Sequence, residues 1–302
     1  MGMIGANGLE LCYETFGDPS DPALLLVNGL SSQLTGWETV MCQRFAAMGR
    51  YVIRYDNRDV GLSTHLTGGT GLLGQVMAAR KGEGEMPDLP YLLSNMAADG
   101  MALLSALGIE RAHIAGVSMG GMIVQTMAIE HPYRVRSLTS IMSTTGESGV
   151  GQSTPEANAA LTAAPTWVRP DYIEQTVRGR RVWSSPRYFD EQYERGRIAR
   201  DFDRMFYPEG VARQYLAILG SPSRAEGLAA LRISTLVIHG RADTLIVPSG
   251  GERTAELVPG ANLLLMNDMG HDLPIPLWPI LIDAMISHQN NAASSAPTRA
   301  GK

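Results

Sequence analysis

The stretch that decides the fold is His113-Ile114-Ala115-Gly116-Val117-Ser118-Met119-Gly120-Gly121-Met122. A short apolar run ends there in Gly-Val-Ser-Met-Gly, and the following segment, Met119–Glu130, is compatible with a helix. The pattern predicts a strand, a tight turn carrying Ser118 and a helix, the setting in which a G-x-S-x-G serine acts as a nucleophile. Gly116 and Gly120 would let strand and helix pack without Cβ clashes, and the helix N-terminus would favour negative charge beside the hydroxyl. The five residues alone would equally suit a glycine-rich turn with an incidental serine.

The composition is that of an ordinary globular protein. The 302 residues suffice for one large domain or a domain with an insertion, and the small, unsegregated net charge of −5 argues against nucleic-acid binding. No apolar run approaches the roughly 18 residues of a membrane span, and the N-terminus lacks the features of a secretory signal. Cys12 and Cys42 lack metal-ligand spacing and fit small buried apolar residues. We expect a cytoplasmic protein that acts on a small molecule and uses no metal or cofactor.

Apolar runs alternate with segments compatible with helices, which predicts a mostly parallel sheet covered by helices. Residues 9–14 alternate between apolar and polar side chains and fit an exposed first strand. Further strands are expected at Ala23–Val27, Tyr51–Tyr55, 113–117, 135–142, 234–239 and Asn262–Met266. Helices are expected at 91–107, Met119–Glu130, Ser249–Leu257 and 277–289. The glycine-rich residues 65–90 fit a loose connection.

The loop at 56–63, directly after the strand Tyr51–Tyr55, carries charges that fit a structural role. Asp56 and Arg58 lie two positions apart, and we expect them to pair with each other and brace the turn. A contact between Arg58 and substrate is the less favoured alternative, because structural ion pairs are far commoner than ligand contacts.

The pattern changes between residues 144 and 228. Buried-strand runs vanish there, and arginine, acidic and aromatic residues become frequent. We expect a largely helical cap at 144–228, inserted into a core formed by 1–143 and 229–290. The small, polar residues at 291–302 fit a disordered tail.

More than half of the aromatic residues lie in the expected cap. Aromatic side chains could line a substrate pocket, and Trp183, Phe206 and Tyr207 are the candidates chosen from this segment. Trp37, which follows the strand Ala23–Val27, is a fourth candidate from the core. The alternative, in which the aromatics only hold the cap together, is expected for many of them.

A serine hydroxyl needs a base to take its proton, and the base needs a partner to fix its tautomer. Asp243 and His271 each follow an expected strand, as Ser118 does, at the end where an open parallel sheet binds ligands. Other histidines lack this strand-end setting. As the acid, Asp268 and Asp272 are too close in sequence to His271, and Glu147 lies farther beyond its strand than Asp243 does. We therefore expect Ser118, His271 and Asp243 to form a catalytic triad.

Two backbone amides are expected to stabilise the oxyanion of an acyl-transfer reaction. One is the N–H of Met119, directly after the nucleophile, and the other is the N–H of Leu30, which follows the strand Ala23–Val27. The Asn28-Gly29 pair before Leu30 is also a common turn sequence, so this assignment depends on the rest of the site.

Five motifs occur in the order and at the spacing of a known superfamily: LLLVNGLSSQLTGW, VIRYDNRDVGLST, GVSMGGM, LVIHGRAD and MGHDLP. With them the chain resembles the α/β-hydrolases, and within these the aclacinomycin methylesterase group and the related macrolide esterases. The resemblance covers residues 9–288 and implies the α/β-hydrolase fold with a cap. One departure concerns Asn28, because many relatives have histidine there. A backbone amide would still serve as donor, but the local bracing must differ.

The leading hypothesis is hydrolysis of a carboxylic ester or macrocyclic lactone through an acyl-Ser118 intermediate. The resemblance and the many methionines favour a large apolar polyketide-type substrate such as a macrolide antibiotic. The alternatives are a methylesterase and a general carboxylesterase for small esters. C–C bond hydrolysis and perhydrolysis use a similar triad and stay open. A non-catalytic binder or receptor of the same fold is the alternative from another class.

Overall fold

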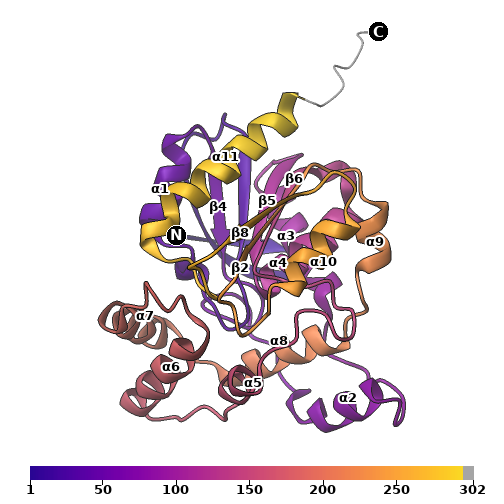
Figure 1. Ribbon diagram of the computed structural model, residues 1–302, viewed down its shortest axis with the longest axis vertical. Coiled ribbons are helices and arrows are strands. Elements are labelled where there is room, and N and C mark those ends of the chain that lie inside the picture. Colours follow the sequence, from indigo (N-terminus) through magenta and orange to yellow (C-terminus); the bar gives the residue numbers. More distant parts are fainter. Residues whose placement is uncertain (295–302) are drawn as a thin grey trace.

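The computed structural model describes residues 1–294, which form one eight-stranded sheet in the order β1-β2-β4-β3-β5-β6-β7-β8 (Figure 1). The strands are β1 (Gly2–Ala6), β2 (Leu9–Phe16), β3 (Ala23–Val27), β4 (Tyr51–Tyr55), β5 (Ala112–Val117), β6 (Val135–Ile141), β7 (Thr235–Gly240) and β8 (Asn262–Met266). The β1–β2 and β2–β4 pairs are antiparallel, and all other neighbours are parallel. The expected α/β-hydrolase architecture is confirmed.

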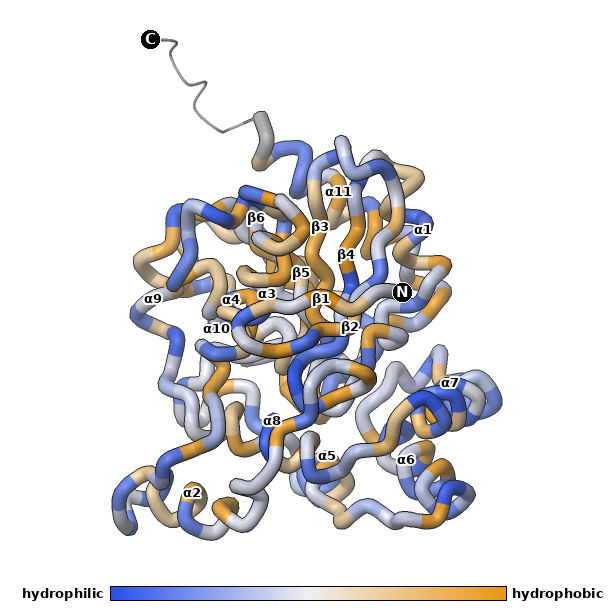
Figure 2. Tube along the Cα trace, turned by 180° about the vertical axis from the view of Figure 1, so that it is seen from behind, coloured by the Kyte–Doolittle hydropathy of each residue, from blue (hydrophilic) through white to orange (hydrophobic). Residues whose placement is uncertain are grey.

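The central strands are buried on both faces because helices cover the sheet from either side. In β3, Leu25 and Val27 belong to one core cluster, while Leu24 and Leu26 belong to the other. The first face is covered by α3 (Leu93–Ala106), α4 (Met119–Glu130) and α10 (Ser249–Leu257), and the second by α1 (Thr39–Ala47) and α11 (Trp278–Ser294). Full burial of a leucine contributes about 1.5–3 kcal/mol, so these apolar strands hold the catalytic loops on a rigid base. In Figure 2, hydrophobic residues concentrate along these strands, whereas α7 has long hydrophilic stretches.

The cap lies at one end of the sheet (Figure 1). Its helices are α5 (Pro155–Leu161), α6 (Arg169–Trp183), α7 (Glu191–Arg204) and α8 (Pro208–Gly220). The short helix α9 (Ala225–Ala230) packs against α4 and α10 of the core. Helix α11 continues through the first four residues of the segment expected to be a disordered tail. The rest of that tail, residues 295–302, lies outside the described residues.

Residues 65–90 contain more structure than the loose connection expected there. A 3₁₀ turn at Thr70–Leu72 leads into α2 (Leu73–Arg80), and both pack against α8. The Arg80 guanidinium donates to the Leu219 carbonyl at 2.8 Å. The glycines that suggested a loop flank this helix, and Val76 is its one fully buried side chain. Because α2 buries only one apolar side chain, its sequence lacks the repeating apolar pattern that would predict a helix.

The expected pairing of Asp56 with Arg58 is wrong. Arg58 instead donates two hydrogen bonds to Asp99 of α3, at 2.6 and 2.7 Å. Asp56 accepts the backbone N–H of Leu34 and an Arg204 hydrogen bond from α7 at 2.7 Å. The two side chains lie close in sequence but reach different neighbours. Asp56 still braces the loop, because it accepts the Leu62 N–H at 2.9 Å, and it also joins the loop to the cap.

Among the described residues, no helix combines the length and apolarity needed to cross a bilayer.

Candidate active site

Ser118 occupies the expected turn between β5 and α4, and its backbone is strained. Its φ of 55° and ψ of −120° lie in a region that non-glycine residues seldom adopt. Such a conformation costs about 1–3 kcal/mol and persists only where the surroundings impose it. Here the Ser118 N–H donates to the Ile141 carbonyl at 2.9 Å, and its carbonyl accepts the Ser143 hydroxyl at 2.8 Å.

Glycines permit the close packing around this turn. A Cβ on Gly116 would lie 2.1 Å from the Gly120 carbonyl oxygen, and a Cβ on Gly120 would lie 2.2 Å from that of Val27. Both distances are far below contact, so a side chain at either position would push strand and helix apart. A Cβ on Gly29 would be 3.1 Å from that of Ser118, which places the loop after β3 directly against the serine.

His271 and Asp243 form the expected hydrogen-bonded pair at the ends of β8 and β7. The distance from His271 Nδ1 to Asp243 Oδ2 is 2.7 Å. The other carboxylate oxygen accepts the N–H groups of Leu245 and Ile246, both at 2.9 Å. On the opposite side, the His271 backbone N–H donates to the Trp183 carbonyl at 2.6 Å. The histidine is therefore oriented by the core and by the last residue of α6.

The environment of Asp243 keeps its carboxylate ionised. Burial by itself would raise the pKa of Asp243, but the charge of His271 and hydrogen bonds with His239 and His271 outweigh this effect. The net result is a pKa below the ordinary aspartate value. An ionised acceptor holds the proton on His271 Nδ1 and leaves Nε2 free to act as a base.

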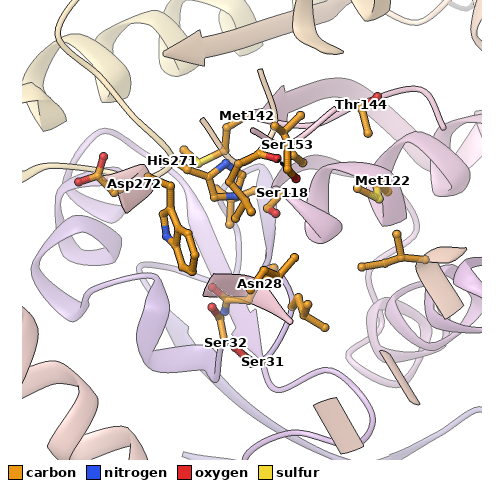
Figure 3. A pocket seen from close by; sticks show the side chains of 18 of the residues that line it. Asn28, Ser31, Ser32, Ser118, Met122, Met142, Thr144, Ser153, His271 and Asp272 are labelled. Carbon is orange, nitrogen blue, oxygen red and sulfur yellow. Dashed lines mark hydrogen bonds between the residues drawn. The ribbon is translucent and has the colours of Figure 1, made fainter. Parts of the chain in front are cut away.

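Ser118 and His271 line the same cavity, as Figure 3 shows. The hydrogen bonds among residues 1–294 do not include one between these two side chains. Catalytic hydrogen bonds are often long or poorly aligned before substrate binds, so this geometry is compatible with proton transfer in a complex.

The cavity has a volume of about 390 Å³, within the range of small-molecule sites. Core loops and cap helices both contribute to its lining. Apolar lining residues near Ser118 and along the cap include Leu30, Val117, Met122, Met142, Trp183 and Ile218. A substrate would thus meet the core at its reacting end and the cap along much of its remaining surface.

The two expected oxyanion donors differ in position. Leu30 lines the cavity, whereas Met119 is fully buried at the first position of α4. Within residues 1–294, no acceptor is found for the backbone N–H of either residue. Neither amide is therefore committed to an acceptor in this part of the chain.

Asn28, the departure noted in the sequence, is buried directly after β3 and two residues before Leu30. Its side-chain oxygen would lie 2.7 Å from a Cβ placed on Gly36, so a side chain at that position would not fit. The Asn28 carbonyl accepts the Asn57 side-chain amide at 3.1 Å. This second asparagine links the loop after β3 to the loop after β4.

Trp183 is the one expected substrate contact that lines the cavity. Trp37 is fully buried in the core cluster beneath α1 and α11. Its indole is enclosed because α1 folds back over the sheet directly after it, which the sequence pattern around Trp37 did not indicate.

Phe206 and Tyr207 also lie outside the cavity lining. Phe206 stacks on Phe202, with ring centroids 4.5 Å apart, within an aromatic cluster that joins α6 to α7. The Tyr207 hydroxyl donates to the Leu66 carbonyl at 2.7 Å, and its ring stacks on His65. Phe206 therefore packs within the cap, and Tyr207 attaches the cap to the core. Both fit the alternative in which the aromatic residues of this segment have a structural role.

Sequence reasoning missed a charged wall of the cavity. Glu194 on α7 pairs with Arg180 of α6 and with Arg197, one turn along its own helix. Arg197 also pairs with Glu38 of the core at 3.1 Å. Burial would raise the pKa of Glu194, but the charges of the two arginines outweigh it and lower the pKa. Glu194 and Arg197 are three residues apart, a spacing that is common on solvent-exposed helix faces. Their sequence positions therefore did not indicate that they line a pocket.

Asp272 is a second carboxylate beside His271 and also lines the cavity. Its Oδ1 accepts the Ser185 backbone N–H at 3.0 Å and the Ser185 hydroxyl. Burial raises the pKa of Asp272, and the Ser185 hydrogen bonds only partly offset this. Burial thus disfavours the ionised form of Asp272, and the hydrogen bonds from Ser185 of the cap partly stabilise that form.

Comparisons with known proteins identify the family of the chain. The family model described as "alpha/beta hydrolase fold" matches residues 22–276. A rhodomycin D methylesterase from Streptomyces sp. (strain C5) is 26% identical, over 96% of this chain and 98% of its own length. The corresponding enzyme of Streptomyces peucetius is also 26% identical over the same shares. A 3-oxoadipate enol-lactonase from Acinetobacter baylyi is 29% identical, over 57% of this chain and 60% of its own.

Solved structures give the same result for the fold. The meta-cleavage product hydrolase from Pseudomonas fluorescens IP01 superposes with a TM-score of 0.75 at 21% identity, covering 97% of this chain and 98% of its own. An esterase from Thermogutta terrifontis gives 0.71 at 20% identity, covering 97% and 99%. At this identity the likeness concerns the fold alone. With the family model spanning most of its length, the chain belongs to the α/β-hydrolase family.

Proposed function

We propose that the protein is a serine esterase that hydrolyses a carboxylic ester through an acyl-Ser118 intermediate. One observation carries this proposal: the strained Ser118 lines the same cavity as His271, which is hydrogen-bonded to the buried Asp243. A strained serine at a helix N-terminus is costly to maintain, and a base oriented by a buried carboxylate is what such a serine requires.

In the proposed reaction, Ser118 Oγ attacks the ester carbonyl carbon while His271 Nε2 takes the hydroxyl proton. The oxyanion of the tetrahedral intermediate accepts hydrogen bonds from the N–H groups of Leu30 and Met119. Removing one such donor costs about 2.7–4 kcal/mol of transition-state stabilisation. The intermediate expels the alcohol, which receives the proton from His271. Water then attacks the acyl-enzyme by the same route, and Asp243 stabilises the imidazolium formed in each step.

The proposed substrate is an ester of a large, mainly apolar molecule of the polyketide type. The apolar lining and the size of the cavity support a substrate whose reacting end is enclosed. Two relatives that match nearly the whole chain are named methylesterases, which favours a methyl ester over a macrocyclic lactone as the reacting group.

The test is turnover of a methyl ester series and of p-nitrophenyl acetate by wild type and Ser118→Ala. The proposal expects an initial burst and steady turnover with wild type. It expects neither with Ser118→Ala, whose circular dichroism should match wild type. A binder or receptor of this fold would retain affinity for ester ligands but show no burst, and that result would refute the proposal.

A further inference from the structure

Arg224 is a buried arginine in the cavity that has no carboxylate partner. It follows α8 at the start of α9 and is 7% exposed. Its Nε donates to the Gln125 side-chain oxygen at 2.9 Å, and its Nη2 donates to the Thr144 carbonyl at 2.8 Å. Both acceptors are neutral. They fix the plane of the guanidinium without balancing its charge.

The remaining nitrogen of this guanidinium is available to a ligand. Within residues 1–294, Nη1 of Arg224 has no hydrogen-bond partner, and it is not among the fully enclosed polar atoms that lack one. Because Arg224 belongs to the cavity lining, a ligand there can reach it. The Arg224 backbone N–H is itself held by the Thr145 carbonyl at 2.9 Å, so the side chain projects from a fixed point.

Apart from Asp272, which only Ser185 holds within residues 1–294, the other partly or fully buried charges of the lining are paired. Arg180 and Arg197 share Glu194, and Arg197 also pairs with Glu38. Glu147 lies two residues after Thr145, whose carbonyl accepts the Arg224 backbone N–H, but its carboxylate pairs with Arg253. The cavity is therefore asymmetric: the charges at α6 and α7 balance each other, Asp272 lies beside His271, and the positive charge of Arg224 lies apart from both, where α8 meets α9.

Arg80 is a useful contrast, because it also lines the cavity but is exposed to solvent. Water stabilises its charge at little cost. A buried guanidinium without a counter-ion is costly, and an anion that binds beside it recovers part of that cost. Burial lowers the pKa of Arg224 to about 10, so the group is still a cation at neutral pH.

We propose that Arg224 binds a carboxylate carried by the ester substrate, at the end opposite the reacting ester. Its partner Gln125 follows Ser118 by seven residues along α4, a rise of about 10 Å at 1.5 Å per residue. The proposed substrate class is an ester with a free carboxylate separated from the scissile carbonyl by a distance on the order of 10 Å, which the length series below measures. This inference rests on the proposed function, which concerns the ester end of the substrate. It adds the recognition of a carboxylate at the opposite end of the same substrate.

The test uses p-nitrophenyl half-esters of straight-chain dicarboxylic acids of increasing length, each paired with its methyl-capped neutral analogue. Wild type should show a higher kcat/KM for the acid than for its analogue, with the largest ratio at a spacing of about 10 Å. A charge-assisted hydrogen bond is worth roughly tenfold or more, so Arg224→Gln should lower this ratio by at least about tenfold. Arg224→Lys should retain part of it. The matched control Arg80→Gln should leave the ratio as in wild type.

Three results would overturn the inference. One is equal kcat/KM for acid and neutral esters in wild type at every length. Another is an equal loss on both substrates in Arg224→Gln, which would make Arg224 only a structural clamp of α4. The third is an equal effect on the ratio from Arg80→Gln. If Arg224→Gln fails to fold, the wild-type length series decides.

Failure of the proposed function would be recognised separately. If wild type hydrolyses no ester, Ser118 is not the proposed nucleophile, but the carboxylate site can still be tested by binding. Long-chain fatty acid anions should then raise the thermal midpoint of wild type more than the matching alcohols do. Equal shifts from acid and alcohol would refute the site.

Discussion

At the scale of single residues, Ser118 bears the clearest local cost of the fold. Its positive φ is imposed by the strand, by the helix and by two hydrogen bonds, to the Ile141 carbonyl and from the Ser143 hydroxyl. Glycine adopts such a backbone without the Cβ clash that serine meets. The Cβ that carries the proposed nucleophile is therefore also the atom that strains the backbone. A residue that relieves this strain should stabilise the fold but cannot supply the hydroxyl.

Replacing Ser118 with glycine should therefore stabilise the protein while abolishing ester turnover. The expected gain over Ser118→Ala is about 1 kcal/mol in the free energy of unfolding, because alanine keeps the strained Cβ. Urea unfolding of both variants measures the difference. Equal stabilities would mean that the surroundings, and not the Cβ, determine the cost of the turn.

Asp272 makes a prediction about pH, because burial raises its pKa in the folded state. Below an ordinary aspartate pKa of about 3.9 the carboxyl is protonated in both folded and unfolded chains. As pH rises, the unfolded chain ionises first, so the folded state loses relative stability until its own pKa is passed. Asp272→Asn has no proton to lose, so its stability relative to wild type should rise as the pH increases above about 4 and level off once the folded-state pKa of Asp272 is passed. Urea unfolding across this range would contradict the account if the difference stayed constant.

The positions of Ser118, Asp243 and His271 after strands could be predicted because the apolar runs of these strands are clear in the sequence. Prediction failed for Asp56, Arg58, Phe206 and Tyr207, for a common reason. Each has a partner far away in sequence, on α3, α6, α7 or the segment before α2, and a pairing of that kind depends on the fold and not on local spacing.

At the scale of elements, the joint between α8 and the loop after β4 attaches the cap to the core. Arg213 of α8 donates two hydrogen bonds to Asp59, both at 2.9 Å, and both side chains are almost fully buried. Gln214 adds a bond from its amide to the Arg58 carbonyl. A buried, hydrogen-bonded ion pair fixes the orientation of α8 relative to this loop, because burying either charge without its partner costs free energy.

Arg213→Met should destabilise the protein by about 3–5 kcal/mol, since it leaves Asp59 buried and unpaired. Asp59→Asn should also be costly, although asparagine tolerates the positive φ of this residue. The double variant should lose less than the sum of the two single losses. Urea unfolding of all four proteins gives the coupling, and strictly additive losses would show that the pair does not act as a unit.

Most core elements could be predicted because double-sided burial imposes continuous apolar runs. The strands β3, β4 and β8 and the helix α10 match their expected bounds. The elements that were missed have weaker patterns. Strand β1 is a short edge strand with two glycines, and α2 buries one side chain. Their places are fixed by pairing with β2 and by packing on α8.

At the scale of the whole molecule, the core and the cap have separable roles in the proposed reaction. The core loops hold Ser118, Asp243 and His271, so esters of any size meet the same groups. The cap supplies walls such as Trp183, while Phe206 serves its internal packing. A substrate large enough to touch the cap should therefore be sensitive to changes that a small ester does not detect.

Trp183→Leu should raise KM for a bulky aromatic ester by about tenfold, since a lost apolar contact is worth about 1–3 kcal/mol. It should change the KM for p-nitrophenyl acetate little. Phe206→Leu is the matched control, because it alters a cap aromatic outside the cavity and should lower stability without changing the ratio of the two KM values. Equal effects on both esters in Trp183→Leu would mean that the cap does not select substrates.

The central claim is that Ser118 is the nucleophile and His271 its base. The most direct measurement is covalent labelling with a fluorophosphonate probe, followed by mass spectrometry of the labelled peptide. The account predicts a single adduct on Ser118, formed much more slowly in His271→Ala and absent in Ser118→Ala. A folded wild-type protein that stays unlabelled, or that carries the adduct on another residue, would contradict it.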